Sequence, residues 1–229
     1  MKYEYYYNTV PGQGQVRNNL VYTSLISEDK KTFVQWYHND TVYHQGKNEI
    51  IDPELMQDKW NREVEYLTLM YENYNDMVPE IRDIDIKEKK IYLNIDGVDF
   101  WQQHFDRQCR YEDVLSDWLE QMLAILEAHN NLGFYKYSLH PSSYFVVDGR
   151  LKSINYFFCH SDNESQLPLE HFRSHISRDR QEKLEVFMSH NDINWNSVLP
   201  YKTLQTICLE SFRSNYPAGF IDRAKMIYA

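Results

Sequence analysis

The sequence predicts an α+β fold, with short strands in the first half of the chain and helices in the second half. Runs rich in β-branched and aromatic residues at 20–27 and 32–37 predict two paired strands. A long amphipathic helix is predicted over Tyr111–His129, and the pattern from Leu167 onward is helical. With 229 residues, 42% of them hydrophobic, the chain is expected to form a single domain with a substantial core.

The first half is predicted to hold two strand pairs separated by one helix. The polar turn Ser27–Lys31 separates the first pair, and residues 81–86 and 91–95 form the second pair. Between the pairs, Asp52-Pro53-Glu54 predicts a helix start, because Asp caps free amide groups and Pro suits the first helical position. One face of this helix is apolar and carries Trp60, Val64 and Leu67.

The second half begins with the helix Tyr111–His129, which is followed by a small hairpin. Tyr144–Val147 and Leu151–Ile154 are short apolar runs on either side of Asp148-Gly149-Arg150, a sequence typical of a tight turn. Further helices follow, with breaks near residues 191–194 and at 217. The apolar stripe of the long helix consists of Val114, Leu115, Trp118, Leu119, Met122, Leu123 and Leu126.

Charge and cysteine content limit the classes of partner and location. The net charge is −10, which disfavours nucleic acid and anionic membranes as general partners. The cysteines at 109, 159 and 208 are widely spaced and imply no disulfide framework. Residues 1–7 lack the apolar core of a signal peptide, and no apolar run reaches the length of a membrane span. We therefore expect a cytoplasmic protein without membrane insertion.

The segment Gly133–Tyr156 resembles the catalytic loop and metal-binding strand of the protein-kinase-like superfamily. Within it, Leu139-His140-Pro141 has a form that is common in the small-molecule and lipopolysaccharide kinase branches. The resemblance implies a two-lobed fold. The N-lobe would cover residues 1–95, with a small antiparallel sheet and one helix, and the mainly helical C-lobe would cover 96–229 after a hinge near 95–98.

The same resemblance implies that the reactive positions have changed. The catalytic Asp position carries Ser138, the metal-binding Asn position carries Ser143, and the metal-binding Asp position carries Asn155. A serine does not accept a proton at neutral pH, and general-base assistance contributes about 10²–10⁴-fold. Mg²⁺ requires carboxylate oxygens in a near-octahedral shell, which Asn155 and Ser143 do not supply. The expected domain is catalytically inactive, with no metal and no cofactor.

The positions that hold nucleotide phosphates in the family have changed as well. Gly12 and Gly14 match the first two glycines of the phosphate-covering loop, but Arg17 stands at the third, and a plain turn explains the pair equally well. The Lys of the third strand falls on Trp36, or on Gln35 if the register shifts by one. Neither side chain is cationic.

Glu63 matches the helix Glu that pairs with this Lys in the family, and Asp96 lies at the expected hinge side of the cleft. An alternative is that Glu63 and Glu65 are both solvated helix charges. Tyr156 replaces the Phe that packs under the helix in active kinases, and Leu67 is a suitable contact for it.

A pair of histidines has the spacing of a metal site. His171 and His175 are four residues apart in a predicted helix, as in two-His metal sites. The metalloprotease version requires Glu after the first His, where Phe172 stands, so surface histidines are the favoured interpretation.

The sequence therefore predicts a pseudokinase-like binding or regulatory module with a protein partner. An alternative from another class is a divergent phosphotransferase acting on a small molecule, sugar or lipopolysaccharide, with Asp148 or Asp162 recruited to a rearranged site. A third is a structural or assembly protein that uses the kinase fold.

Overall fold

The computed structural model describes residues 2–6, 22–38, 41–44, 47–50, 53–136, 139–161, 167–168 and 178–228. The chain divides into two units, and we describe each by itself. The first unit combines residues 1–121 with 141–158, and the second combines 122–140 with 159–229. These bounds differ from the expected lobe bounds of 1–95 and 96–229. The division into those two lobes stays a prediction.

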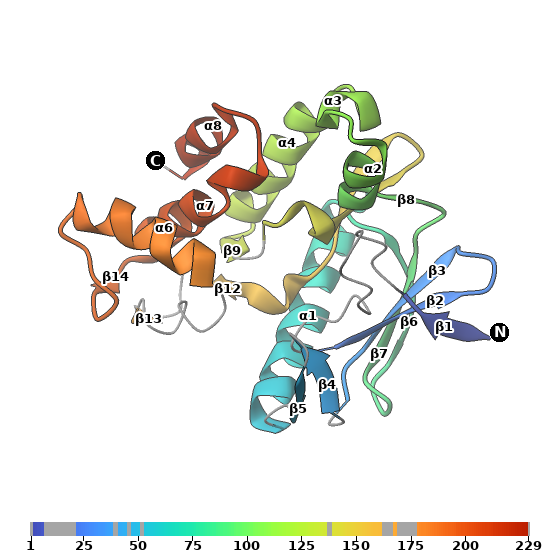
Figure 1. Ribbon diagram of the computed structural model, residues 1–229. Coiled ribbons are helices and arrows are strands. Elements are labelled where there is room, and N and C mark those ends of the chain that lie inside the picture. The colour runs from blue at the N-terminus through green and yellow to red at the C-terminus, as the bar shows by residue number, and fades with distance from the viewer. Residues whose placement is uncertain are drawn as a thin grey trace. The chain divides into compact units, whose positions relative to one another are not determined.

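An antiparallel sheet forms the framework of the first unit (Figure 1). Its five strands lie in the order β1-β2-β3-β7-β6, and the predicted strand pairs are both present in it. Strand β3 is central and pairs with β2 and β7, and its side chains Phe33 and Gln35, which lie on one face, are buried. The strands are β1 (Tyr3–Tyr5), β2 (Thr23–Ser27), β3 (Thr32–Trp36), β6 (Glu80–Asp85) and β7 (Lys90–Asn94). A separate hairpin consists of β4 (Thr41–His44) and β5 (Lys47–Ile50).

Helix α1 (Pro53–Asn73) begins at the predicted proline and packs against the short helix η2 (Tyr156–Phe158). Of the predicted apolar face, Trp60 and Leu67 are buried and Val64 is half-buried, so this face of the helix points inward as predicted. Just after the last turn of α1, Lys152 Nζ donates hydrogen bonds to the carbonyl oxygens of Asn75 (3.3 Å) and Asp76 (2.8 Å). This side chain therefore fixes the segment that leaves the helix.

The predicted hairpin belongs to a second, three-stranded sheet in the order β11-β10-β8. Asp148 and Gly149 both have positive φ, 51° and 70°, as a tight turn of the I′ kind requires. At the other edge, a Cβ built on Gly97 would lie 2.1 Å from the carbonyl oxygen of Val146, so only glycine fits there. The strands are β8 (Gly97–Asp99), β10 (Tyr144–Val147) and β11 (Arg150–Ser153).

The prediction of one continuous helix over 111–129 was wrong, because the structure has two helices here. Helix α3 (Tyr111–Val114) ends at Leu115, whose φ of −149° and ψ of 112° are extended, and α4 (Trp118–Asn131) follows. The break brings the Tyr111 and Trp118 rings against Phe100, with ring centroids 4.9 Å and 6.2 Å away. Phe100 starts α2 (Phe100–Arg107), a helix that the sequence pattern did not predict.

The inward stripe of α4 agrees with the prediction. Trp118, Met122 and Leu126 are all buried. Helix α4 begins in the first unit and ends in the second.

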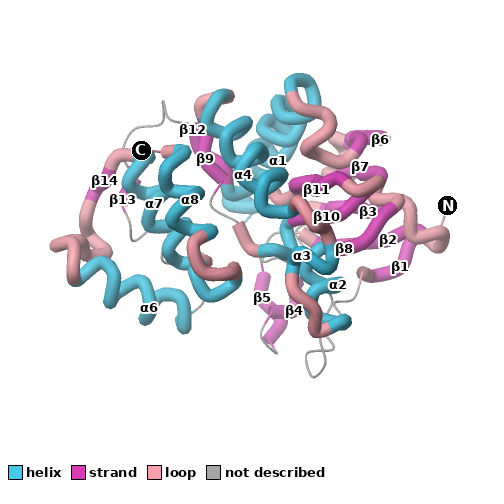
Figure 2. Tube along the Cα trace, turned by 90° about the horizontal axis from the view of Figure 1, so that it is seen from above, coloured by secondary structure: helices cyan, strands magenta, loops and turns pink. Residues whose placement is uncertain are grey.

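The second unit is mainly helical, as the sequence predicts for residues after 167. Strand β9 pairs with β12, and α7 packs against α6, α8 and β9 (Figure 2). The predicted breaks at 191–194 and 217 fall between its helices. Its elements are β9 (Phe134–Lys136), β12 (Cys159–Ser161), β13 (Leu167–Pro168), α6 (Arg178–Ser189), β14 (Val198–Leu199), α7 (Tyr201–Ser211) and α8 (Phe220–Ile227).

Among the described residues, no helix combines the length and the apolar character needed to cross a membrane.

Candidate functional site

Asn155, the residue at the metal-binding Asp position of the resemblance, lies directly after β11 and Ile154. Its φ is 69°, a left-handed conformation that Asn tolerates better than most residues. Its Nδ2 donates a hydrogen bond to Ser143 Oγ at 2.9 Å, and the Ile154 amide donates to the Ser143 carbonyl at 2.9 Å. The structure thus brings Ser143 and Asn155 together, although the hairpin separates them in sequence.

The amide oxygen of Asn155 accepts hydrogen bonds from two side chains that lie far from it in the sequence. The Tyr22 hydroxyl and Gln35 Nε2 (3.3 Å) both donate to Oδ1. All four side chains, of Tyr22, Gln35, Ser143 and Asn155, are buried. We call these four residues the Asn155 network. None of them carries a formal charge at neutral pH.

The Asn155 network does not fit a magnesium ion. Mg²⁺ demands a near-octahedral shell of oxygens, with carboxylates among the protein ligands. Here the Asn155 oxygen receives two hydrogen-bond donors, and the Ser143 oxygen receives the Asn155 amide. The lone pairs that would bind a cation are thus directed at donor groups.

Gln35, and not its neighbour Trp36, joins the network. Successive residues of a strand point to opposite faces, so Trp36 points away from Asn155. Its ring lies under the ammonium group of Lys90, 4.6 Å from Nζ to the ring centroid, and 4.4 Å from the His38 ring. Of the two positions considered for the strand Lys, Gln35 is the one whose side chain contacts Asn155, and the assignment stays a prediction.

Glu63 is fully buried in α1, whereas Glu65 is exposed, so only Glu65 is a solvated helix charge. Glu63 Oε2 accepts hydrogen bonds from the Tyr37 hydroxyl (3.1 Å) and from the Phe157 amide (2.8 Å). Burial, and then the charge of Glu63, raise the pKa of Tyr37 well above its ordinary value. The carboxylate therefore ties α1 to the end of β3 and to η2.

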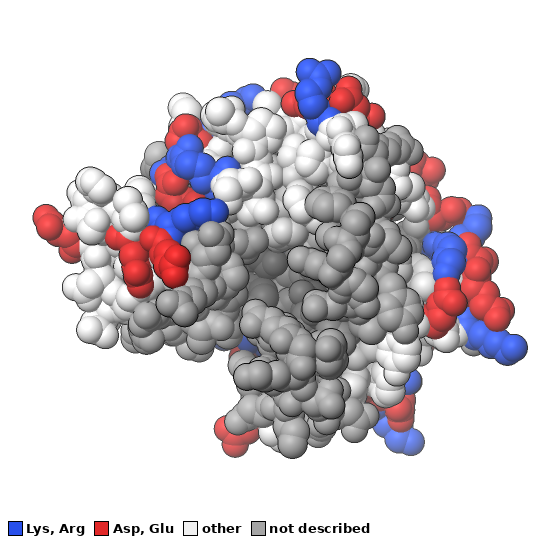
Figure 3. Space-filling model, in the orientation of Figure 1, with Lys and Arg blue, Asp and Glu red and all other residues white. Residues whose placement is uncertain are grey.

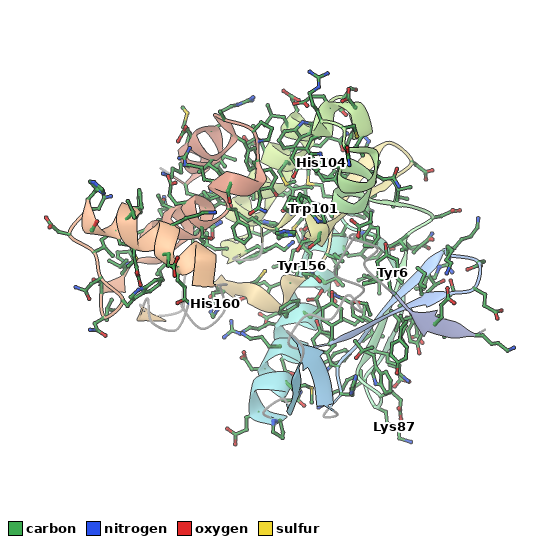
Figure 4. The ribbon with its side chains drawn as sticks, viewed as in Figure 1. Tyr6, Lys87, Trp101, His104, Tyr156 and His160 are labelled. Atoms are coloured by element: carbon green, nitrogen blue, oxygen red, sulfur yellow. The ribbon has the colours of Figure 1, made fainter. Side chains whose placement is uncertain are left out.

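Tyr156 is buried in η2, the element that packs against α1 (Figure 4). Leu67, its expected contact, is buried in α1. The two elements are in contact, and the packing role that the resemblance implies for Tyr156 stays a prediction.

Aromatic rings fill the space beside the Asn155 network. Phe33 contacts Phe145 of β10 at a centroid distance of 5.5 Å, and Tyr6 meets the Phe33 ring at 5.8 Å. The Tyr22 ring lies 5.3 Å from that of Tyr37. The inner face of β3 is thus covered by direct contacts with the 141–158 segment.

The remaining positions from the resemblance do not join the network. Asp96 is exposed, and its Oδ2 lies 2.6 Å from Lys31 Nζ, a contact that raises the pKa of Lys31. Gly12, Gly14 and Ser138 lie outside the described residues.

The described residues contain no group of three or more His, Cys, Asp or Glu that could hold a metal ion. His171 and His175 are not among the described residues. The described His104 stacks on Tyr111, with ring centroids 4.2 Å apart. On the face drawn in Figure 3, basic and acidic side chains are intermixed over the part that the structure describes.

Sequence reasoning missed two members of this region, Tyr22 and Tyr37. Both fall in predicted strands, where aromatic residues are expected for packing alone. Their hydroxyl partners are far away in the chain, and no local motif marks them.

Comparisons with known proteins add little to this geometry. No protein-family model and no curated protein matches the chain. Among solved structures, the chain is similar to the bifunctional kinase-methyltransferase WbdD, with a TM-score of 0.49 and 10% sequence identity. The match covers 99% of this chain and 51% of WbdD, so the chain spans about half the length of that protein. A likeness of this degree establishes neither a common fold nor a common activity.

Proposed function

We propose that this chain is a catalytically inactive, kinase-like domain that acts as a binding or regulatory module for a protein partner. The order of elements supports a kinase-like fold. A small antiparallel sheet with the single long helix α1 precedes a hairpin, and Ser143 and Asn155 flank that hairpin. In this proposal the lobes cover residues 1–95 and 96–229, and the protein is cytoplasmic.

The observation that carries the proposal is the closed inner face of β3. Phe33 is covered by Phe145, and Gln35 donates a hydrogen bond to Asn155, so described side chains of the same chain occupy this face. The Asn155 network also supplies no charge to neutralise phosphate oxygens or to hold a metal ion. Catalysis of phosphoryl transfer depends on both, since it is mostly positioning and electrostatic stabilisation.

The alternative of a divergent phosphotransferase would need a carboxylate in this region. Asp148 lies in the hairpin turn, on a surface pocket of about 300 Å³ that Arg150 and Lys152 also line. Asp162 is outside the described residues. The Asn155 network itself contains no carboxylate, which supports the inactive module over this alternative.

Thermal unfolding with nucleotide tests the proposal. We expect the same melting temperature with millimolar ATP and Mg²⁺ as with ATP and EDTA, because no described group fits the metal. A ligand at 100 times its Kd stabilises the native state by about 2.7 kcal/mol, which such a scan detects readily. An active kinase measured alongside provides the positive control. A clear Mg²⁺-dependent rise in the melting temperature would contradict the inactive-module proposal.

A further inference from the structure

A surface pocket of about 300 Å³ lies in the first unit, beside the turn between β10 and β11. Residues from the end of α1, the loop after it, β6, β7 and the hairpin line the pocket, and Figure 2 labels these elements. None of the described residues that line it belongs to the Asn155 network. The volume is at the lower end of the range for small-molecule sites, so the pocket suits a small ligand.

Hydrogen bonds hold two walls of the pocket in place. Lys152 Nζ donates to the carbonyl oxygens of Asn75 and Asp76, which fixes β11 to the loop after α1. Asn94 Nδ2 donates to Glu80 Oε2 at 2.9 Å, which links the side chains of β7 and β6. Because these lining groups are already fixed, a ligand that enters the pocket does not have to order them.

The hairpin turn supplies one charged group of each sign that is available to a ligand. Asp148 and Arg150 lie on either side of Gly149, and both are exposed and line the pocket. Within the part of the chain that the structure describes, neither the Asp148 carboxylate nor the Arg150 guanidinium forms an ion pair or a hydrogen bond. Arg150 and Lys152 are two residues apart in β11, so both side chains lie on the same face of this strand.

The charges of the lining select a ligand that carries both signs. Two carboxylates, of Glu80 and Asp148, and two cations, of Arg150 and Lys152, give a formal net charge of zero. A purely anionic ligand is repelled by the carboxylates, and a purely cationic ligand is repelled by the cations. Burial, and then the Arg150 charge, lower the pKa of Lys152, although Asp76 and Asp148 oppose this shift. A ligand carboxylate beside Arg150 therefore also favours the charged form of Lys152.

We propose that this pocket binds a free amino acid in its zwitterionic form. The Arg150 guanidinium donates hydrogen bonds to the ligand carboxylate, and the Asp148 carboxylate accepts hydrogen bonds from the ligand ammonium group. The ligand side chain packs against Pro79 and Val147, the apolar residues of the lining. This binding goes beyond the inactive-module function and does not depend on it.

Calorimetric titration of the wild type with L-leucine and two analogues tests the proposal. N-acetyl-leucine lacks the ammonium group, as does the carboxyl end of a polypeptide, and leucine amide lacks the carboxylate. We expect millimolar binding of L-leucine and about tenfold weaker binding of each analogue, because each analogue loses a hydrogen bond between charged groups. The absence of L-leucine binding, or equally strong binding of either analogue, overturns the proposal.

Two variants assign each charged group of the ligand to its partner. In Asp148→Asn, L-leucine and N-acetyl-leucine are expected to bind equally, because the partner of the ammonium group is gone. This variant keeps the turn, since Asn-Gly is a preferred type I′ sequence. In Arg150→Gln, L-leucine and leucine amide are expected to bind equally, because the partner of the carboxylate is gone. If either variant keeps the selectivity of the wild type, the proposal is overturned.

Asp192→Asn is the matched control for Asp148→Asn. Asp192 is also exposed and also has a positive φ, of 53°, but it lies in the second unit and does not line the pocket. Asp192→Asn is expected to bind L-leucine with the selectivity of the wild type. An equal loss of selectivity in both variants overturns the proposal. These failures leave the inactive-module proposal standing, which only Mg²⁺-dependent ATP binding by the wild type contradicts.

Discussion

At the scale of single residues, Glu63 keeps a position that pairs with Lys in the family the sequence resembles, yet it has different partners here. A buried carboxylate without donors is very costly, so its burial requires replacement hydrogen bonds. The Tyr37 hydroxyl and the Phe157 amide provide them. In this structure Glu63 Oε2 acts as a structural acceptor for these two groups.

Replacing Glu63 should reveal this structural role. Glu63→Ala leaves the Tyr37 hydroxyl and the Phe157 amide without this acceptor, and each buried unsatisfied group costs about 1–3 kcal/mol. We expect a comparable loss in the free energy of unfolding by urea. Glu65→Ala, at an exposed position of the same helix, should stay within about 0.5 kcal/mol of the wild type. Similar losses in both variants would contradict the role assigned to Glu63.

At this scale, the sequence identified some residues of the Asn155 network and missed others. Ser143 and Asn155 were identified because they flank a hairpin whose motif is local. Tyr22 could not be identified, because it lies 133 residues before its partner Asn155 and no spacing rule connects them. The choice between Gln35 and Trp36 needed the pairing register of β3, which neighbouring strands determine.

At the scale of elements, the sequence located helix α1 and the strands β2, β3, β6, β7, β10 and β11, but it missed other short strands and the interruption after α3. One missed strand is β8, which begins at Gly97 and pairs with β10. The interruption after α3 was missed because the apolar stripe continues across Leu115 with helical spacing. Packing of Tyr111 and Trp118 on Phe100, a tertiary effect, accounts for it.

The close approach of β8 to β10 gives a prediction for Gly97. A Cβ on Gly97 would lie 2.1 Å from the Val146 carbonyl oxygen, so Gly97→Ala must push the strands apart. Overpacking of this kind costs about 1–3 kcal/mol, and separation of the pair adds lost hydrogen bonds. Gly149→Ala serves as the control, since it meets no atom within 4 Å and suffers only the strain of its positive φ. Chemical denaturation should rank Gly97→Ala as the more damaging change, and the reverse order would count against the β8–β10 pairing.

At the scale of the whole molecule, stability should depend on pH through His129 in the second unit. Burial, and then the nearby charge of Lys136, hold the pKa of His129 well below 6.5. Below pH 6.5 the unfolded chain therefore binds a proton that the folded chain does not bind. The contribution of His129 to the free energy of unfolding is therefore highest above pH 6.5 and falls as the pH decreases below it.

We expect the free energy of unfolding to fall by about 1 kcal/mol for each pH unit below 6.5, until His129 is protonated in the folded state. His129→Gln should remove most of this slope between pH 6.5 and 5, measured by urea denaturation at each pH. His190→Gln, at an exposed position, should retain the slope. An unchanged slope in His129→Gln would refute the assignment.

Two sets of hydrogen bonds among the described residues limit how helix α1 can move. Glu63 holds its middle to η2, and Lys152 holds the chain just beyond its end to β11. At a rise of about 1.5 Å per residue, these points are separated by roughly 15–20 Å along the helix axis. The helix can pivot about one of these contacts only after the other contact has broken. A change in the tilt of α1 would therefore require the loss of the Glu63 hydrogen bond or of the Lys152 hydrogen bonds.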